Sequence, residues 1–465
     1  MPCRLRLDGS ALRAAERSRR AGDTFGRGVT GPAGSALRVL ALEPYFGGSH
    51  RAFLEQWTAH SRHGFELLTL PARHWKWRMR HAAVTFAAEI RGRVDGGGPP
   101  PWDIVFATDM LSLAELRGLV PPAIAALPTV LYFHESQLDY PDRRPHDGDL
   151  HFAFTNLTSA LAADEVWFNS NFHHETFLDG VHRLLRRMPE RRLDDEVERL
   201  RARCRVEPPG VEPSSTTASG EAAKRRGEGP LHVVWAARWE HDKQPETFFR
   251  AVRGALAAGA ELRLSVLGQA FRDVPQCFEQ ARRELAGVVV DWGFQPRQRY
   301  LEILAGADVF VSTAGHEFFG LAAVEAMVRG CAVLLPDRLS YPELVERDGR
   351  WLWRDEQELV ARLIELAGPR PGRARAAADR QAASRLAGSA VRRFGWRARA
   401  PALDAGLERV ARSLTAIGCS DAGPVPDPRG RGGPALRSDE SHLALPRRAA
   451  RHPSSARGSR SASAG

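Results

Sequence analysis

The sequence predicts an α/β protein with two doubly wound parallel-sheet domains of the Rossmann type. Short apolar segments alternate with helix-like segments along both halves of the chain, and few hairpin turns separate them. A segment rich in Pro, Gly and Ser divides the two halves. A chain of 465 residues is long enough for two such domains with tails.

The first half begins with the apolar strand Leu37–Leu42, followed by the glycine-containing turn Glu43–His50 and a helix from about Ala52. A strand, a glycine turn and a helix in this order are typical of the start of a parallel sheet. Four further strands are expected at Phe65–Leu70, Ile104–Ala107, Thr129–Phe133 and Glu165–Asn169. We therefore place an N-terminal Rossmann-like domain at residues 37–205.

The second half begins after a linker at residues 206–230. Its first strand is expected at Leu231–Ala236. Four more strands are expected at Leu262–Leu267, Val288–Trp292, Val309–Ser312 and Ala332–Leu335. We place a C-terminal Rossmann-like domain at residues 231–412, and two such domains around a linker predict a cleft between them.

The two ends of the chain carry most of its positive charge. The formal net charge is +10, but residues 1–36 hold seven Arg against three acidic residues, and residues 413–465 hold eight Arg against four. Both segments lack apolar periodicity, so we expect a disordered extension at 1–36 and a disordered tail at 413–465. The basic composition thus indicates nucleic-acid binding by the folded part only weakly.

Five widely spaced cysteines form no CxxC pair. Neither a disulfide framework nor a zinc site is predicted, which favours the cytoplasm. No apolar run approaches the roughly 20 residues that a membrane span needs. We therefore expect no membrane association.

The clearest chemical signal lies between residues 312 and 325. A strand ends at Ser312, a loop carries Glu317, and a helix begins near Gly320. The free N–H groups at a helix start suit a phosphate, and glycine lets it approach closely. Glu325, in the early turns of this helix, can accept hydrogen bonds from ribose hydroxyls, and Glu317 from those of a second sugar. Two surface acids are the competing interpretation, which the strand–loop–helix context disfavours.

Glu317 and Glu325, with Phe319, Gly320 and Leu321 between them, resemble the E-x7-E signature of the family 4 glycosyltransferases. The resemblance implies the GT-B fold, in which two Rossmann-like domains face a cleft. It also implies retaining transfer from a nucleotide-sugar donor without a metal or other cofactor. In that family the first glutamate contacts the transferred sugar and the second contacts the ribose, and the residues between them border the donor.

Arg238 and Lys243 follow the first strand of the second half. They resemble the basic pair that holds the donor diphosphate in these enzymes. Two cations facing an anion-binding helix start would neutralise the departing diphosphate. Solvated surface cations are the alternative, although the chain has only three lysines.

A narrower resemblance, to the tRNA-queuosine alpha-mannosyltransferases, runs from about residue 37 to about residue 407. The blocks that carry it are Glu43-Pro-Tyr-Phe-Gly-Gly-Ser-His50, Leu70-Pro-Ala-Arg-His-Trp-Lys-Trp-Arg78, Tyr132-Phe-His-Glu-Ser-Gln-Leu138, Phe168-Asn-Ser170, Arg238-Trp-Glu-His-Asp-Lys243 and His316-Glu-Phe-Phe-Gly320. It implies GDP-mannose as the donor and queuosine in the anticodon of tRNA-Asp as the acceptor.

His134 and the pair Gly47 and Gly48 each have two interpretations. The resemblance implies that His134 touches the donor sugar, and a buried structural histidine is the alternative. Gly47 and Gly48 either bring their loop close to donor or acceptor or simply form a turn. Glu343 is a further candidate for a supporting acid in the donor site.

The segment His74–His81 alternates aromatic and cationic residues. This pattern suits stacking on an unpaired base with phosphate contacts nearby. A basic helix whose tryptophans pack inward is the alternative.

The predicted reaction is retaining transfer with front-face attack, since no protein nucleophile is evident. Arg238, Lys243 and the helix start near Gly320 would stabilise the departing diphosphate, while Glu317 and His134 orient the sugar. Two other functions remain open. One is a family 4 glycosyltransferase acting on a lipid or small glycan, and the other is a non-catalytic protein that binds tRNA or a nucleotide sugar.

Overall fold

The computed structural model describes residues 36–94, 99–138, 150–191, 193–213, 229–270, 274–368 and 373–420. Almost all of the expected extension at 1–36 and most of the expected tail at 413–465 lie outside these ranges. Both sheets belong to one structural unit that ends at Ile417. Among the described residues, no helix combines the length and the apolar character needed to cross a membrane.

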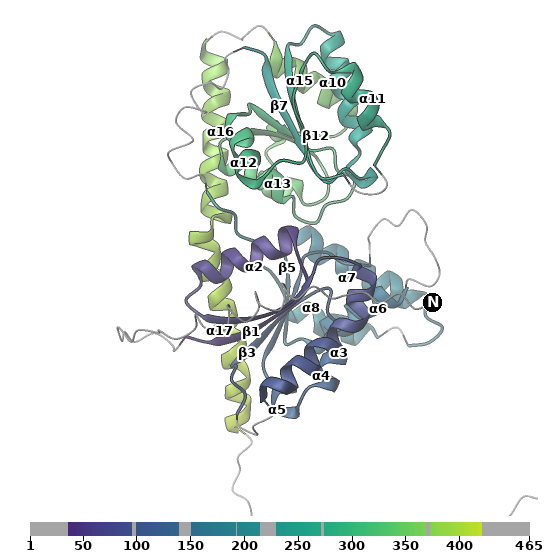
Figure 1. Cartoon of the computed structure of the whole chain (residues 1–465), viewed down its shortest axis with the longest axis vertical. Helices are drawn as coiled ribbons and strands as arrows, with labels where there is room; N and C mark the ends of the chain where they lie inside the picture. Colours follow the sequence, from purple (N-terminus) through teal and green to yellow (C-terminus); the bar gives the residue numbers. More distant parts are fainter. Residues whose placement is uncertain are drawn as a thin grey trace, which may run out of the picture. The chain divides into compact units, whose positions relative to one another are not determined.

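The first sheet has six parallel strands in the order β2-β1-β3-β4-β5-β6 (Figure 1). They are β1 (Arg38–Phe46), β2 (Gly64–Pro71), β3 (Ile104–Thr108), β4 (Thr129–Phe133), β5 (Glu165–Phe168) and β6 (Cys204–Val206). The strand order reverses between β1 and β3. Open α/β sheets bind ligands at the carboxyl ends of the strands beside such a switch point.

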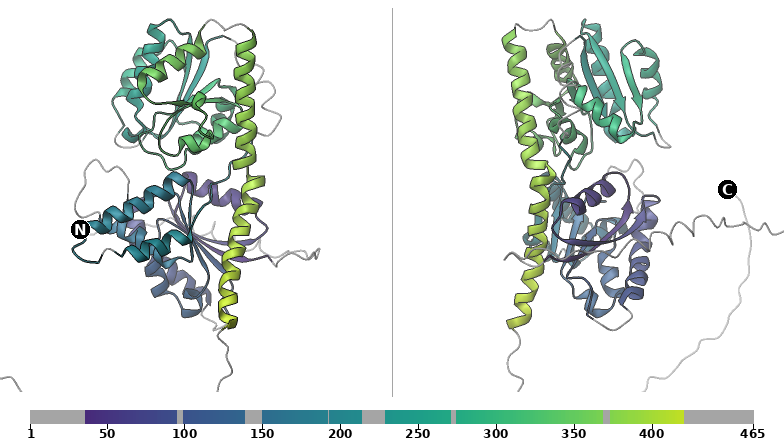
Figure 2. Two further views of the ribbon diagram at one scale, coloured as in Figure 1. Left: turned by 180° about the vertical axis from the view of Figure 1, so that it is seen from behind. Right: turned by 60° about the vertical axis from the view of Figure 1, so that its left-hand side comes forward.

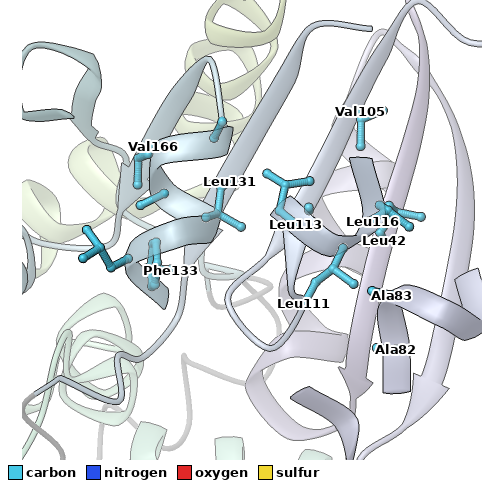
Figure 3. Close-up of a cluster of buried hydrophobic side chains, with 14 of the residues drawn as sticks. Leu42, Ala82, Ala83, Val105, Leu111, Leu113, Leu116, Leu131, Phe133 and Val166 are labelled. Carbon is cyan, nitrogen blue, oxygen red and sulfur yellow. The ribbon is translucent and has the colours of Figure 1, made fainter. Parts of the chain in front are cut away.

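Helices cover both faces of the first sheet. Leu40 and Leu42 of β1 lie in the core on one face, part of which Figure 3 shows, while Val39 and Ala41 lie in the core on the opposite face. The first face is covered by α3 (Trp75–Val94), α4 (Leu113–Leu119), α5 (Pro122–Ala125), α6 (Leu150–Ala162), α7 (Asn171–Arg186) and α8 (Asp194–Arg203). The opposite face is covered by α2 (Gly48–His60) and α17 (Trp396–Ser420). Burial on both faces explains the continuous apolar run of β1.

The second sheet also has six parallel strands, in the order β12-β11-β10-β7-β8-β9. They are β7 (Leu231–Ala236), β8 (Leu262–Leu267), β9 (Val289–Gly293), β10 (Val309–Val311), β11 (Ala332–Pro336) and β12 (Leu352–Trp353). From the opposite edge this is the Rossmann strand order, and its switch point lies between β7 and β10.

Helices likewise cover both faces of the second sheet. Val233 and Trp235 of β7 face one core, and Val234 faces the other. The helices on the first of these faces are α10 (Pro245–Ala257), α11 (Cys277–Glu284) and α15 (Glu356–Ala367). Those on the second are α12 (Arg297–Gly306), α13 (Leu321–Val328), α14 (Tyr341–Leu344) and α16 (Arg373–Phe394). Two 3-10 turns, η2 (His241–Lys243) and η3 (Gly349–Trp351), complete this half.

The predicted fold class is confirmed, and all ten predicted strands are present. The sequence did not predict β6 and β12, with three and two residues, which lie at sheet edges. Segments this short show no periodicity, and only their pairing with a neighbouring strand identifies them.

Helix α17 departs from the expected domain division. Figure 2 shows α16 continuing into α17, and the expected second domain included this segment as far as residue 412. Instead, Trp396 and Leu403 pack into the core of the first sheet, and the indole N–H of Trp57 donates to Asp404 at 2.9 Å. The helix also continues to Ser420, past the expected start of the tail.

Candidate functional site

The candidate donor-site residues follow the carboxyl ends of β7 and β10, beside the switch point of the second sheet. Arg238 and Lys243 come after β7, and Glu317 and Gly320 come after β10. Because the two strands are parallel neighbours, these segments meet at one edge of the sheet. Lys243, Glu317 and Gly320 line a hollow of ≈ 300 Å³ there.

Lys243 is the buried cation of this hollow. Its Nζ donates to the carbonyl oxygen of His316 at 2.7 Å and lies 3.1 Å from Asp242 Oδ2 and 3.5 Å from Glu317 Oε2. Burial alone would lower the pKa of Lys243, but the carboxylates of Glu317 and Asp242 outweigh it and raise the pKa. Lys243 is therefore an ammonium ion at neutral pH, placed where an anion can bind.

The loop that carries Glu317 is fastened to the turn that carries Lys243. Gly315 N–H donates to the carbonyl oxygen of Asp242 at 2.7 Å, and Thr313 Oγ1 donates to that of Lys243 at 2.9 Å. The Glu317 side chain keeps 30% of its surface exposed. Its carboxylate is thus held at a fixed place with one side open to a ligand.

Gly320 begins helix α13 with φ +91°, in the left-handed region. A Cβ on Gly320 would lie 2.9 Å from Cε1 of Tyr341, so both backbone and packing require glycine. The adjacent Phe319 ring packs on Phe394, and Leu321 lies against the same core. Phe319 and Leu321 therefore help to hold the helix start in place.

Glu325 is buried within α13 and already has two partners. Its Oε2 accepts a hydrogen bond from the Tyr300 hydroxyl at 2.9 Å, and its Oε1 accepts one from the Arg297 guanidinium. An ionised carboxylate offers about four acceptor sites. A ribose hydroxyl would therefore share Glu325 with Tyr300 and Arg297, two residues that sequence reasoning did not identify.

Arg238 lies at the surface. Its side chain is 46% exposed, and Nη2 is 3.4 Å from Glu240 Oε2. Arg238 is not among the residues that line the hollow with Lys243. The predicted basic pair is thus one buried ammonium and one exposed guanidinium in the same loop.

His134 follows β4 at the carboxyl edge of the first sheet. Its backbone N–H donates to Asp109 Oδ1 at 2.9 Å, and its carbonyl oxygen accepts from Asn169 at 2.9 Å. Burial, together with the neighbouring His50 and His173, lowers the pKa of His134 well below its ordinary value. Its Nε2 is buried and has no hydrogen-bond partner in the described part of the chain. His134 is therefore a neutral imidazole whose buried Nε2 has an unused hydrogen-bonding position.

Three residues that sequence reasoning did not select surround His134. Glu43 is fully buried in the second half of β1, and its Oε2 lies 3.2 Å from Nδ1 of His50. Burial alone would lower the pKa of His50, but Glu43 and the nearby Asp109 and Glu135 raise it to about 9. Burial also raises the pKa of Asp109 to about 8. An acidic residue directly after the apolar run of a strand was the available signal for this cluster.

Glu43, His50 and His134 are the group of described residues that could hold a metal, with ligand atoms within 4.8 Å of one another. Both histidine rings would have to direct a nitrogen at one point. Their centroids are 4.0 Å apart and their planes are tilted by 34°, so the rings lie nearly stacked rather than converging. The arrangement thus favours an imidazolium–carboxylate pair, and metal-independent catalysis stays a prediction.

Gly47 and Gly48 form the turn into α2. A Cβ on Gly47 would lie 2.4 Å from Cβ of Ala72, and Gly48 has φ +51°. Packing and backbone conformation account for both glycines, while the turn also lies at the carboxyl edge that carries His134.

Two family models match this chain. Residues 38–211 match the N-terminal domain of tRNA-queuosine alpha-mannosyltransferase, and residues 230–368 match the group 1 glycosyl transferases. The tRNA-queuosine alpha-mannosyltransferase of Drosophila melanogaster is 35% identical over 338 residues, which cover 70% of this chain and 86% of that protein. A GDP-mannose-dependent phosphatidylinositol dimannoside mannosyltransferase of Mycobacterium tuberculosis is 26% identical over 145 residues, or 31% of this chain and 37% of that protein.

Solved structures show the same fold at low sequence identity. Anabaena HepE in complex with UDP and glucose superposes with a TM-score of 0.55 and 17% identity, covering 83% of this chain and 100% of that one. Sucrose-phosphate synthase from Thermosynechococcus elongatus superposes with a TM-score of 0.60 and 15% identity, covering 82% of this chain and 100% of that one. The likeness concerns the arrangement of strands and helices.

Proposed function

This chain belongs to the tRNA-queuosine alpha-mannosyltransferase family, and we propose on that premise that it transfers mannose from GDP-mannose to queuosine in the anticodon of tRNA-Asp. That it is a glycosyltransferase follows from the family and from the group 1 domain. GDP-mannose as donor is supported by the mycobacterial relative, whose name makes it GDP-mannose-dependent. Because the proposed acceptor is a tRNA, we propose that the activity takes place in the cytoplasm and that no membrane takes part in it.

One observation carries the proposed donor site: Lys243 Nζ and the Glu317 carboxylate lie 3.5 Å apart in a hollow that the start of α13 also borders. The ammonium and the free N–H groups of the helix start suit a diphosphate. Glu317 suits the hydroxyls of the attached sugar. The hollow combines a cation, a helix start and a carboxylate that can accept hydrogen bonds from a sugar. This combination matches a nucleotide sugar better than it matches a nucleotide or a sugar alone.

The proposed reaction retains the configuration at the anomeric carbon. The acceptor hydroxyl attacks C1 of mannose from the face that GDP leaves, and the C1–O bond to the β-phosphate breaks. The hydroxyl proton passes to the departing β-phosphate oxygen. Lys243 and Arg238 offset the negative charge that develops on GDP, which is the interaction that accelerates such a step.

Glu317 and His134 are proposed to orient the sugar. Glu317 accepts from sugar hydroxyls, and Nε2 of His134, which is buried without a hydrogen-bond partner in the described residues, is proposed to gain a sugar hydroxyl as its partner. Because His134 is neutral, it approaches the sugar without repelling the Lys243 ammonium.

Transfer of label from radioactive GDP-mannose to total tRNA tests the proposal, with tRNA from cells that contain or lack queuosine. We expect label only on queuosine-containing tRNA-Asp. Hydrolysis of GDP-mannose without labelled tRNA would retain the glycosyltransferase and reject the acceptor. Absence of both transfer and hydrolysis in every preparation would favour a binding protein without turnover.

A further inference from the structure

We propose that the first turns of α3 and the loop just before them form an RNA-binding surface, on which the indole of Trp77 stacks an unpaired base while Arg73, Lys76 and Arg80 contact phosphates. We call these four residues the α3 surface. The inference rests on the proposed RNA acceptor and specifies where, outside the candidate donor site, that RNA is held.

Trp77 is the exposed aromatic residue of this surface. All 11 tryptophans of the sequence lie in the described ranges, and Trp77 is the only one whose side chain is exposed, at 63%. A solvated indole presents a flat π-face that any nucleobase can cover. A single exposed apolar side chain is common on protein surfaces, so Trp77 indicates a ligand only in combination with the cations around it.

Positive charge surrounds the exposed indole. Arg73, Lys76 and Arg80 are exposed, and the sequence contains no acidic residue between Glu66 and Glu89. A cluster of exposed cations such as this one attracts a polyanion such as the phosphate backbone.

The residues beneath the surface are tightly packed. The Trp75 ring lies 5.1 Å from that of Phe152, and Met79 is buried. Nε of Arg78 donates to the Pro71 carbonyl oxygen at 3.1 Å. Of the two tryptophans in the motif, Trp75 thus packs inward and Trp77 points to solvent. Trp77 is therefore displayed on a rigid helix, which lowers the entropy lost when a base stacks on it.

The α3 surface adjoins the edge of the first sheet that carries His134. Trp75 and Tyr45 both pack against the cluster of Met79, Met110 and Phe152. The Tyr45 ring lies 5.9 Å from that of His50, whose ring lies 4.0 Å from that of His134. These contacts form a continuous path from the surface to the candidate catalytic residue. An RNA loop with one nucleotide beside His134 would leave a neighbouring nucleotide near Trp77.

The outer face of α3 fits RNA better than a membrane. A membrane-bound helix presents a row of large apolar side chains to the lipid. In α3, all of which is described, Trp77 and Val84 are the exposed large apolar residues. One aromatic ring among cations is instead typical of single-stranded nucleic-acid binding.

Fluorescence anisotropy with the full chain and a labelled, unmodified anticodon stem–loop of tRNA-Asp tests the proposal. We expect Trp77→Ala to weaken binding about tenfold, as loss of one stacked base predicts, and Trp77→Phe to retain most of the affinity. The pair Arg73→Glu and Lys76→Glu is expected to weaken binding about tenfold or more. The same double substitution should also make the plot of log affinity against log salt concentration less steep, by about 0.7 for each phosphate contact that is lost.

The matched control is the pair Arg282→Glu and Arg283→Glu, which makes the same charge change on exposed positions of α11. Thermal melting checks that each variant folds. Equal RNA affinity of Trp77→Ala and wild type, or equal losses in the two charge-reversed pairs, would overturn the proposal. Binding of wild type to phosphatidylglycerol vesicles but not to RNA would overturn it in favour of a lipid surface.

The outcome for the α3 surface is separate from the outcome for the proposed function. RNA affinity that depends on Trp77, combined with no transfer of mannose to any tRNA, would support the surface and reject the function. The opposite result is also possible to recognise. If the wild type transfers mannose to queuosine-containing tRNA while the substitutions of Trp77 and Lys76 leave RNA affinity unchanged, the function is supported and the surface is rejected.

Discussion

The hydroxyl of Tyr300 donates to Oε2 of Glu325 at 2.9 Å, so the glutamate predicted to bind ribose is held from α12 before any donor arrives. Arg297 holds the other carboxylate oxygen. Both partners fix the direction of the carboxylate. A fixed acceptor binds a ligand with less loss of side-chain entropy than a free one.

Tyr300→Phe removes this hydrogen bond and is expected to weaken GDP binding about two- to tenfold, the range for one hydrogen bond of ordinary net strength. Glu325→Ala removes the ribose contact itself and should weaken GDP binding further. Isothermal titration of each variant with GDP gives the comparison. Wild-type affinity in Glu325→Ala would show that Glu325 holds Arg297 and Tyr300 for structural reasons alone.

Glu317→Ala is expected to lower kcat about 100-fold while GDP affinity changes less than about threefold. The carboxylate meets the sugar and not the nucleotide, so its loss affects the transition state more than binding of the leaving group. Initial rates of mannose transfer, with GDP titration alongside, separate the two quantities. Glu279→Ala, on the exposed face of α11, is the control. A loss confined to GDP affinity would contradict the assigned role.

His50 makes stability depend on pH. Its folded-state pKa of about 9 exceeds the ordinary 6.5, so folding favours the protonated ring. This contribution is fully present below pH 6.5 and is lost as the pH rises towards 9. We expect the free energy of unfolding to fall by up to about 3 kcal/mol across this interval.

Urea unfolding of wild type and Glu43→Gln at several pH values measures this effect. Glu43 is the charge that contributes most to raising the pKa of His50, so Glu43→Gln should make the dependence shallower, most clearly between pH 8 and 9, above the pKa of Asp109. An equal slope in both proteins would place the titrating group elsewhere.

The parts of the fold that depend on short stretches of sequence were predictable. Apolar runs located ten strands, and the strand–loop–helix context around Gly320 located the hollow that Lys243 and Glu317 line. Contacts between distant segments were not predictable. The packing of α17 on the first sheet depends on Trp396 meeting α2, and the partners of Glu325 lie 25 and 28 positions away.

The histidine cluster shows the same limit. A resemblance indicates His134, whereas burial and the charges of His50 and His173, which set its protonation, are not evident from a sequence. For the segment His74–His81, the sequence left open whether its tryptophans stack on an unpaired base or pack inward. The structure assigns one to each residue, with Trp75 inward and Trp77 outward.

Glu343, a candidate supporting acid for the donor site, lies instead at the start of α7. Its Oε1 accepts from Phe172 N–H at 2.6 Å, and its Oε2 accepts from Asn171 N–H at 2.9 Å. These N–H groups lack partners within α7, and the helix dipole favours a negative charge at this position. The carboxylate thus acts as an N-terminal cap supplied by α14.

Glu343→Gln is therefore expected to lower the free energy of unfolding by about 1–2 kcal/mol, because a neutral amide replaces two charge-assisted hydrogen bonds. GDP affinity should stay at the wild-type value, since Glu343 does not line the hollow with Lys243. Urea unfolding and GDP titration of the same variant measure both quantities. Glu261→Gln, at an exposed position just before β8, controls for the loss of charge. Unchanged stability with weaker GDP binding would return Glu343 to the donor site.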